Sequence, residues 1–356
     1  MVVTKRVARN KLQLLHSEKL DRLGWLVHAF STRLGGVSRR YGGSALNLGF
    51  TRDDSRAAVE RNRGLFLKEL GVADGRKSWP LVSLRQIHSD LIYPVDRMPP
   101  QPLTGDGIIT DSPGLVVAVQ TADCLPIILA DPKRRAVGVL HAGWRGTVKR
   151  IVEKGVGEMR KHFKSDPRDI VAAIGPGVQG CCYDVGEEVR TKFESQFAYA
   201  GSLFREVKES DPVREKYPLL FLTARAPGHS ELPVKLFLDL VEANRRQLLD
   251  AGVLAKNIEA AAPCTACHTE LLFSFRAEKG VTGRMMGAVG IRTKWSPVSL
   301  IGRSGDRAIE NPRLVGELPD DPMTRSVYAR SKSRTSASSV ALMVRLFSSL
   351  MAAPSP

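Results

Sequence analysis

Residues 121–147 read TADCLPIILADPKRRAVGVLHAGWRGT, and this stretch decides how the chain is expected to fold. Two apolar runs flank Asp131–Arg134, a pattern typical of a β-hairpin with a short polar loop. We expect Ala130 to pair with Arg135 across the hairpin. In that register Cys124 and His141 lie directly opposite each other on one face, with Cβ atoms about 4.5–5.5 Å apart. A slip of one residue would separate them.

A cysteine facing a histidine has two chemical interpretations and one structural one. The thiolate and the imidazole can share a metal ion, or they can form a nucleophile and its general base. The structural alternative is a buried free cysteine acting as a small hydrophobic residue, beside a hydrogen-bonded histidine. The functional readings gain support from the segment Gly143–Thr147, which leads into a helix predicted over 147–163 with Thr147 as its cap.

That helix start favours an anionic ligand near the hairpin. The first N–H groups of a helix attract negative charge, and Arg145 supplies a guanidinium suited to phosphate or carboxylate. For a metal, His88 in Gln86-Ile87-His88 is the best third ligand, because it follows an extended run and has polar neighbours. A His–Cys–His set leaves one tetrahedral position open, as in catalytic zinc sites.

Outside the hairpin, helix and strand patterns alternate from about residue 12 to about residue 302, which predicts an α/β domain. Further helices are expected over 54–70, capped by Asp53 or Asp54 and closed by Gly71, and over 239–251, closed by Gly252. Strands are expected over 115–119, 126–130, 136–140 and 170–174. The predicted organisation is a basic N-terminal tail (1–11), a catalytic domain (12–302) and a mobile C-terminal extension (303–356).

Composition narrows the class of protein. The 356 residues carry a formal charge of +16, with 43% hydrophobic and 25% charged residues, as in ordinary globular proteins. No apolar run is long enough to span a membrane, and five cysteines in a chain of this length do not suggest a disulfide framework. We therefore expect a cytoplasmic monomer or homodimer without a membrane partner. The basic residues show no aromatic-interleaved motif, so we expect no nucleic-acid partner.

Several short motifs together carry a resemblance to a known family. They are Ser31–Ser38 (STRLGGVS), Asn47–Gly49 (NLG), Gln86–Asp90 (QIHSD), Asp106-Gly107, Thr121–Pro126 (TADCLP), His141–Gly146 (HAGWRG), Ile174–Pro176 (IGP), Cys264-Thr265 and Thr282–Met285 (TGRM). Across Trp25–Ile291 the chain resembles the bacterial YfiH-like laccase-domain family, once described as multicopper polyphenol oxidases. The family is now described as purine nucleoside phosphorylases that also deaminate adenosine.

The resemblance implies a single domain of layered mixed β-sheets flanked by helices. It also implies that His88, Cys124 and His141 bind catalytic zinc, with Cu²⁺ as the alternative ion at the same site. The substrates would be phosphate and a purine nucleoside such as adenosine, inosine or methylthioadenosine. Five residues are expected at the substrate: Arg145 and Arg33 for phosphate, Gln86 and Asp123 to orient the ligands, and Asn47. The segment that usually reads FSYRR in the family is Phe273–Ala277 (FSFRA) here.

Three other functions stay open on the sequence alone. One is a laccase-like copper-binding polyphenol oxidoreductase, and another is a metal-free hydrolase using Cys124 and His141. The third is a cytidine-deaminase-like enzyme, because His229, Glu231, Cys264 and Cys267 fit the H-x-E…P-C-x-x-C signature. Cys264–His268 also matches the c-type haem attachment pattern, which we set aside because attachment belongs to exported chains.

Overall fold

The predicted hairpin forms in the computed structural model, which describes residues 2–4, 12–73, 77–208 and 234–293. Its strands are β9 (Leu125–Asp131) and β10 (Ala136–Ala142), both buried along their whole length. The predicted C-terminal extension (303–356) lies outside the described residues.

The register of the hairpin differs from the expected one. Asp131, not Ala130, is the last paired residue of β9, and it pairs with Ala136. The reason is local: Asp131 Oδ1 accepts hydrogen bonds from the backbone N–H groups of Lys133 and Arg134, so Asp131 begins the turn. His141 consequently pairs with Pro126. The predicted direct opposition of Cys124 and His141 is wrong.

The shift nevertheless keeps the two side chains on the same face. The ladder ends at the pair of Leu125 with Ala142, and just beyond it Cys124 Sγ lies 2.8 Å from the place that a Cβ at Gly143 would take. Residues 141 and 143 point to the same side because side chains alternate along a strand. Cys124 and His141 are therefore diagonal neighbours, a relation that long side chains can bridge.

Two six-stranded mixed sheets form the centre of the fold. The first has the order β1 (Val2–Thr4), β2 (Leu14–Ser17), β3 (Leu26–Ser31), β16 (Met285–Ile291), β8 (Val116–Thr121), β5 (Leu81–Ser83). The second has the order β15 (Ile258–Glu259), β11 (Val171–Ile174), β9, β10, β7 (Gly107–Thr110), β6 (Ile92–Pro94). Most pairs are antiparallel, whereas β5 with β8, β6 with β7 and β11 with β15 are parallel.

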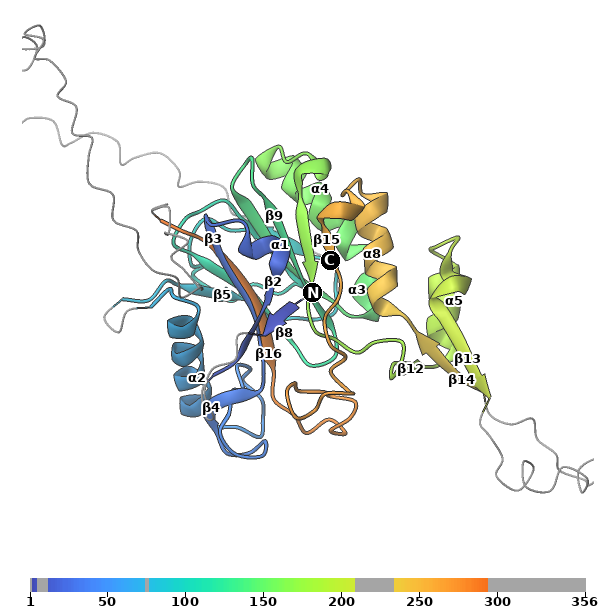
Figure 1. Ribbon diagram of the computed structural model, residues 1–356, viewed down its shortest axis with the longest axis horizontal. Helices are drawn as coiled ribbons and strands as arrows, with labels where there is room; N and C mark the ends of the chain where they lie inside the picture. Colours follow the sequence, from blue (N-terminus) through green and yellow to red (C-terminus); the bar gives the residue numbers. More distant parts are fainter. Residues whose placement is uncertain (1, 5–11, 74–76, 209–233, 294–356) are drawn as a thin grey trace, which may run out of the picture. The chain divides into compact units, whose positions relative to one another are not determined.

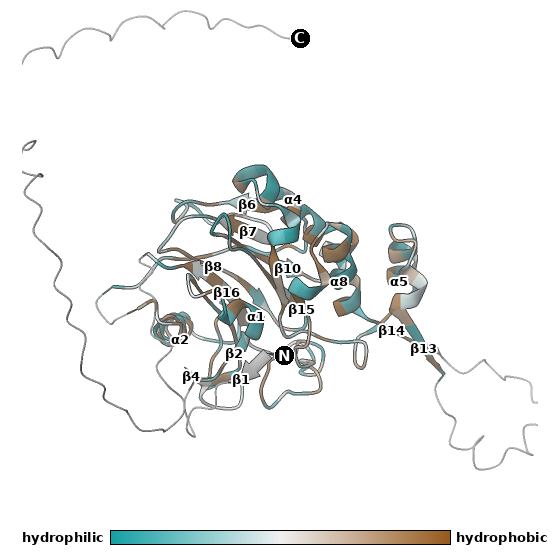
Figure 2. Cartoon of the chain, turned by 45° about the horizontal axis from the view of Figure 1, so that its top comes forward, coloured by the Kyte–Doolittle hydropathy of each residue, from teal (hydrophilic) through white to brown (hydrophobic). Residues whose placement is uncertain are grey.

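The sheets pack face to face, with helices on their outer faces. Alternation along β9 explains this: Ile128 belongs to the buried cluster that contains Val117 and Val289 of the first sheet, whereas Leu129 belongs to the cluster that contains Val156 of a helix. Figure 1 shows α2 (Arg56–Glu69) beside the first sheet, and α4 (Ile151–Phe163) and α8 (Leu240–Asp250) beside the second. Hydrophobic colour follows the inner strands in Figure 2. The predicted α/β class with layered mixed sheets is confirmed.

The helices lie close to their predicted positions, but two of the predicted N-caps are wrong. Helix α2 is capped by Ser55, whose hydroxyl accepts from the N–H of Ala58, so the expected Asp53 or Asp54 cap is wrong. The helix predicted over 147–163 is two helices, α3 (Trp144–Val148) and α4. They are separated at Arg150, where φ is +62°. Thr147 lies inside α3, where its hydroxyl donates to the Gly143 carbonyl, and it caps neither helix. Helix α8 follows its prediction, with Asp239 as cap.

The remaining elements are smaller. Residues Val2–Thr4, in the predicted N-terminal tail, pair with β2, consistent with their β-branched sequence. A third sheet contains β12 (Asp184–Val185), β14 (Val234–Leu238) and β13 (Phe204–Lys208), next to α5 (Glu187–Glu194). The other described elements are helix α1 (Glu18–Asp21), strand β4 (Leu34–Ser38) and three short 3-10 helices (Pro167–Asp169, Ala200–Leu203 and Ala255–Asn257). Within the described residues, the helices are too short or too polar to cross a membrane.

Candidate metal centre and cavity

Three segments far apart in the sequence bring the predicted metal ligands together. His88 lies between β5 and β6, Cys124 in the turn from β8 to β9, and His141 on β10. One ligand atom of each lies within 4.8 Å of the others, and Cys124 Sγ is 3.8 Å from His88 Nε2. The two imidazole centroids are 4.9 Å apart. The arrangement is able to hold a metal ion, and binding itself stays a prediction.

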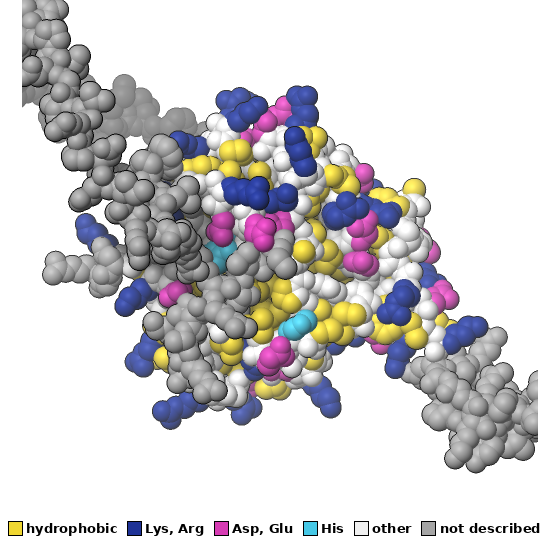
Figure 3. Space-filling view, viewed as in Figure 1, with side chains coloured by type: hydrophobic (Ala, Val, Ile, Leu, Met, Phe, Trp, Pro, Cys, Tyr) yellow, Lys and Arg dark blue, Asp and Glu magenta, His cyan; other side chains and the backbone are white. Residues whose placement is uncertain are grey.

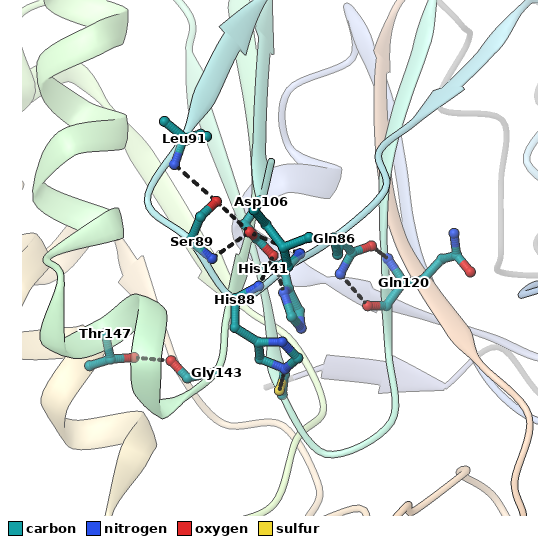
Figure 4. A network of polar contacts seen from close by, with 11 residues as sticks. Gln86, His88, Ser89, Leu91, Asp106, Gln120, His141, Gly143 and Thr147 are labelled. Carbon is teal, nitrogen blue, oxygen red and sulfur yellow. Dashed lines mark hydrogen bonds and ion pairs between the residues drawn. The ribbon is translucent and has the colours of Figure 1, made fainter. Parts of the chain in front are cut away.

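Asp106, immediately before β7, orients both histidines (Figure 4). It is fully buried, and its Oδ1 lies 2.8 Å from His141 Nδ1 and accepts from the His88 N–H. Its Oδ2 accepts from both the backbone N–H and the hydroxyl of Ser89. Because Nδ1 of His141 is held by a carboxylate, Nε2 is the ring nitrogen that remains to bind a metal ion. Asp106 therefore fixes one imidazole directly and the other through its backbone.

Electrostatics make the three groups a good cation site. Burial alone would raise the pKa of Cys124, but the neighbouring His141 and His88 lower it to about 6. Burial alone would lower the pKa of His141, but Cys124 and Asp106 raise it to about 9. Cys124 and His141 thus favour each other's charged forms, and a divalent cation can replace the proton between them.

Gly143 leaves the space that the Cys124 and His88 side chains occupy. A Cβ at this position would lie 2.8 Å from Cys124 Sγ and 3.0 Å from His88 Cδ2. Its φ of −81° is ordinary, so the requirement for glycine is one of space and not of backbone conformation. The glycine of the HAGWRG motif is therefore explained by the packing of the Cys124 and His88 side chains against it.

Two backbone outliers border the centre. His88 has φ of +57° and Asp123 has φ of +92°, conformations that are costly for residues with side chains. The Asp106 contacts hold His88. The carboxylate of Asp123 accepts from the hydroxyls of Thr265 and Ser274 and from the Arg276 N–H, so it ties two segments, at 265 and at 274–276, to the turn that carries Cys124.

A cavity of about 900 Å³ opens onto this centre. Its lining includes five cationic side chains, Arg85, Arg145, Arg276, Lys279 and Arg284, and one carboxylate, that of Asp123. The aromatic rings of Trp144, Tyr183 and Phe275 also line it. Since the Asp123 oxygens already accept three hydrogen bonds, the cavity favours an anion.

Some predicted substrate residues lie elsewhere. Arg33 is not among the residues that line the cavity: its guanidinium donates to the carbonyls of Thr269 and Tyr41 and pairs with Glu278. Asn47 is also outside the lining and accepts from the Arg284 N–H, which positions that arginine's segment. The contacts of Arg33 and Asn47 are therefore with other parts of the fold and stabilise it.

Gln86 and Asp123 do line the cavity. Both amide atoms of Gln86 are bonded to the backbone of Gln120, as Figure 4 also shows. Both side chains fix loops around the centre. Their contact with substrate stays a prediction.

Sequence reasoning missed several groups that the fold brings to the site. Asp106 appeared only as part of a motif, because its proximity to His141 follows from the long-range pairing of β7 with β10. Arg276 and Arg284 lie in the FSFRA and TGRM segments, so those motifs were the available signal. Tyr183 had no signal; Arg276 lies over its ring at 5.2 Å, and burial raises the pKa of its hydroxyl.

The cytidine-deaminase-like set is only partly visible. His229 and Glu231 lie outside the described residues. Cys264 and Cys267 lie together with Cys181 and Cys182. All five cysteines are described, and all are free thiols, as the sequence led us to expect.

Basic side chains are spread out on the face shown in Figure 3, with acidic ones between them. This distribution gives no single basic patch on that face of the described residues. The concentration of cations inside the cavity is instead the more specific electrostatic feature.

Comparison with known proteins places this geometry in context. Residues 27–292 match the family model described as "Multi-copper polyphenol oxidoreductase laccase". The "Purine nucleoside phosphorylase YlmD" of Geobacillus stearothermophilus is 33% identical over 293 residues, covering 77% of this chain and 96% of that protein. "Adenosine deaminase RL5", from an unknown prokaryotic organism, is 33% identical over 275 residues, covering 74% of this chain and 94% of that protein.

A solved structure of the same relative has a similar fold. The crystal structure of YlmD from Geobacillus stearothermophilus aligns with a TM-score of 0.65 at 30% identity, covering 82% of this chain and all of that one. The family match spans most of the described residues, including the three predicted ligands. The chain therefore belongs to the multi-copper polyphenol oxidoreductase laccase family, whose relatives include proteins named purine nucleoside phosphorylase and adenosine deaminase.

Proposed function

We propose that the protein is a zinc-dependent purine nucleoside phosphorylase that also deaminates adenosine at the same site. In phosphorolysis a phosphate oxygen bonds to C1′ of the ribose as the bond from C1′ to the purine nitrogen breaks. The products are the base and ribose 1-phosphate. The observation that carries the proposal is the cationic, aromatic-lined cavity that opens directly onto His88, Cys124 and His141.

The cations suit phosphate as the second substrate. Arg145 is fixed by stacking over the ring of Trp144 at 4.4 Å, and it starts in the first turn of α3, next to the ligand set. Helix α3 is only five residues long, so we assign phosphate binding to guanidinium groups and not to a helix dipole. Arg276 and Arg284 take the place of Arg33 as further donors, because both line the cavity.

The aromatic side chains suit the purine. Trp144, Tyr183 and Phe275 line the same cavity, and the Phe275 side chain is half exposed. A planar heterocycle gains from stacking on such rings. A base held there while phosphate is held by the arginines brings the glycosidic bond between the two groups, so proximity contributes to the rate.

The donor set fits zinc better than a blue-copper centre. Two imidazoles and one thiolate suit either ion, but a blue-copper site adds a weak axial methionine or glutamine. Methionine is absent from the described cavity lining, so the lining does not offer the axial thioether of a typical blue-copper centre. A Zn²⁺ ion held by His88, Cys124 and His141 would supply Lewis acidity beside the bound nucleoside.

The chain's own residues prepare the site for both reactions. Asp106 keeps Nε2 of His141 directed at the ligand position, and the cationic lining stabilises negative charge that develops on the departing purine. Deamination exchanges the 6-amino group of adenosine for the oxygen of water and releases ammonia. It needs the same base pocket and no phosphate.

The test is product analysis with adenosine in the presence and absence of phosphate. We expect adenine and ribose 1-phosphate only with phosphate, and inosine and ammonia in both. Arg145→Ala should reduce adenine release and spare inosine formation, with Arg160→Ala, an exposed substitution on α4, as the control. Adenine release that ignores phosphate would overturn the phosphorylase assignment.

A further inference from the structure

The four cysteines other than Cys124 form a second cluster. Cys181 and Cys182 follow β11 in the turn before β12, and Cys264 and Cys267 follow β15. The two pairs are more than eighty residues apart in sequence, yet the four Sγ atoms all lie within 4.8 Å of one another. The proposed reaction uses none of them.

The sulfur separations suit a tetrahedral metal site. Cys267 Sγ is 3.5 Å from Cys181 Sγ and 3.3 Å from Cys182 Sγ. Four sulfurs bonded to one Zn²⁺ at about 2.3 Å lie about 3.8 Å from one another, within the range found here. A disulfide would bring two sulfurs to about 2.0 Å.

The local backbone also resembles a thiolate-binding turn. Cys264 is buried, and its sulfur accepts from backbone N–H groups of Ala266 and Cys267 in the same turn and of Gln179. N–H groups directed at a thiolate from within a C-x-x-C turn hold the ligand in place. His268 is not a competing ligand through Nδ1, which lies 3.0 Å from the carbonyl of Cys264.

We propose that Cys181, Cys182, Cys264 and Cys267 form a structural site for Zn²⁺, separate from the catalytic centre. Four thiolates leave no open position, which is the pattern of structural and not catalytic zinc. Binding releases the thiol protons to solvent, and no oxidant or reductant is involved. This inference does not depend on the proposed reaction.

The site would stabilise the β8–β9 turn, which carries Asp123 and Cys124. Thr265, the neighbour of Cys264, donates its hydroxyl to Asp123 Oδ1 and its N–H to the Gly177 carbonyl. Val178, three residues before Cys181, donates to the Asp123 carbonyl. A metal bound by both cysteine pairs would thus link the segments of Val178 and Thr265, which both donate hydrogen bonds to Asp123, the residue before Cys124.

The test is metal binding by the full chain, purified with reductant, and by two variants. We expect about two Zn²⁺ per wild-type chain and about one in Cys124→Ala, with Cys181→Ser/Cys267→Ser also at about one. Co²⁺ bound to Cys124→Ala should give the intense visible and thiolate charge-transfer bands of a four-sulfur site. Chelation should lower the Tm of Cys124→Ala, which keeps the cluster.

The outcomes separate this proposal from the proposed function. A metal-free Cys124→Ala with an unchanged Tm on chelation would overturn the four-thiol site and leave the catalytic centre intact. A wild-type chain that binds metal at the four cysteines but not at His88, Cys124 and His141 would support the four-thiol site and overturn the proposed catalytic zinc. An intact mass showing a disulfide among these cysteines in protein isolated with reductant would also overturn it. If the double variant does not fold, the Co²⁺ spectrum of Cys124→Ala still decides.

Discussion

Replacing Asp106 by asparagine should weaken the metal centre more than it weakens the fold. The carboxylate accepts from His141 Nδ1 at 2.8 Å, from the Ser89 N–H at 2.6 Å and from the His88 N–H at 3.1 Å. An amide offers only one oxygen, so at least one buried N–H loses its acceptor whichever way the amide turns. That loss costs about 1–3 kcal/mol.

The metal should be held less tightly because the orientation of both histidines depends on Asp106. Loss of a residue that orients a ligand typically lowers metal affinity about 10–100-fold, or about 1.4–2.8 kcal/mol. The assay is graded chelation: the free metal concentration at which each variant loses half of its own turnover reports only the catalytic site. We expect this concentration to rise about 10–100-fold in Asp106→Asn.

Asp131→Asn is the matched control. Asp131 is also a fully buried carboxylate, and its Oδ1 accepts from backbone N–H groups at the loop end of the same hairpin. It touches no ligand, so its substitution should leave the half-loss concentration unchanged. Equal half-loss concentrations in both variants would refute the claim that Asp106 positions the histidines.

The same carboxylate predicts a pH dependence of stability. Burial alone would raise the pKa of Asp106, but the hydrogen bonds from His141 and Ser89 lower it to about 2. A pKa below the unfolded value of about 3.9 stabilises the fold above pH 4, by about 2–3 kcal/mol, and this is lost as pH falls from about 4 to about 2. Urea unfolding of wild type against Asp106→Asn should show the difference shrinking across that window. A constant difference would contradict the assignment.

Three further predictions concern the cavity and the ligands. Arg145→Ala should raise the KM for phosphate about 10–100-fold, equivalent to about 1.5–3 kcal/mol for a charged hydrogen bond, and leave the KM for adenosine nearly unchanged; steady-state kinetics with varied phosphate checks this. Gly143→Ala should lower metal content, because the new Cβ would lie 2.8 Å from Cys124 Sγ; a variant with full metal content and activity would refute the spacing argument. Chelation should abolish turnover and added Zn²⁺ should restore it, whereas activity that resists chelation but is lost on thiol alkylation would favour a metal-free Cys124–His141 hydrolase.

The hairpin shows how much of the site the sequence could supply. The two apolar runs on either side of a short polar loop correctly predicted β9 and β10. The register is shifted at Asp131, but Cys124 and His141 still come together. The error arose because the expected loop ignored the carboxylate's bonds to the N–H groups of Lys133 and Arg134. Cys124 and His141 were brought together by the fold, but diagonally and not directly across the ladder.

The residues that sequence reasoning missed depend on long-range contacts. Asp106 meets His141 only because β7 pairs with β10, and no local pattern encodes that pairing. The break between α3 and α4 at Arg150 was hidden because the apolar spacing continues through it. The clustering of Cys264 with Cys181 likewise required two turns from opposite ends of a long segment to meet.

Phosphate-dependent turnover of adenosine by wild type and Cys124→Ala tests the central claim most directly. Adenine and ribose 1-phosphate should form in wild type only when phosphate is present, and Cys124→Ala should form neither, although it keeps metal at the four-thiol cluster. Adenine release at the wild-type rate by Cys124→Ala would remove the thiolate from the reaction. Adenine release by wild type without phosphate would contradict phosphorolysis itself.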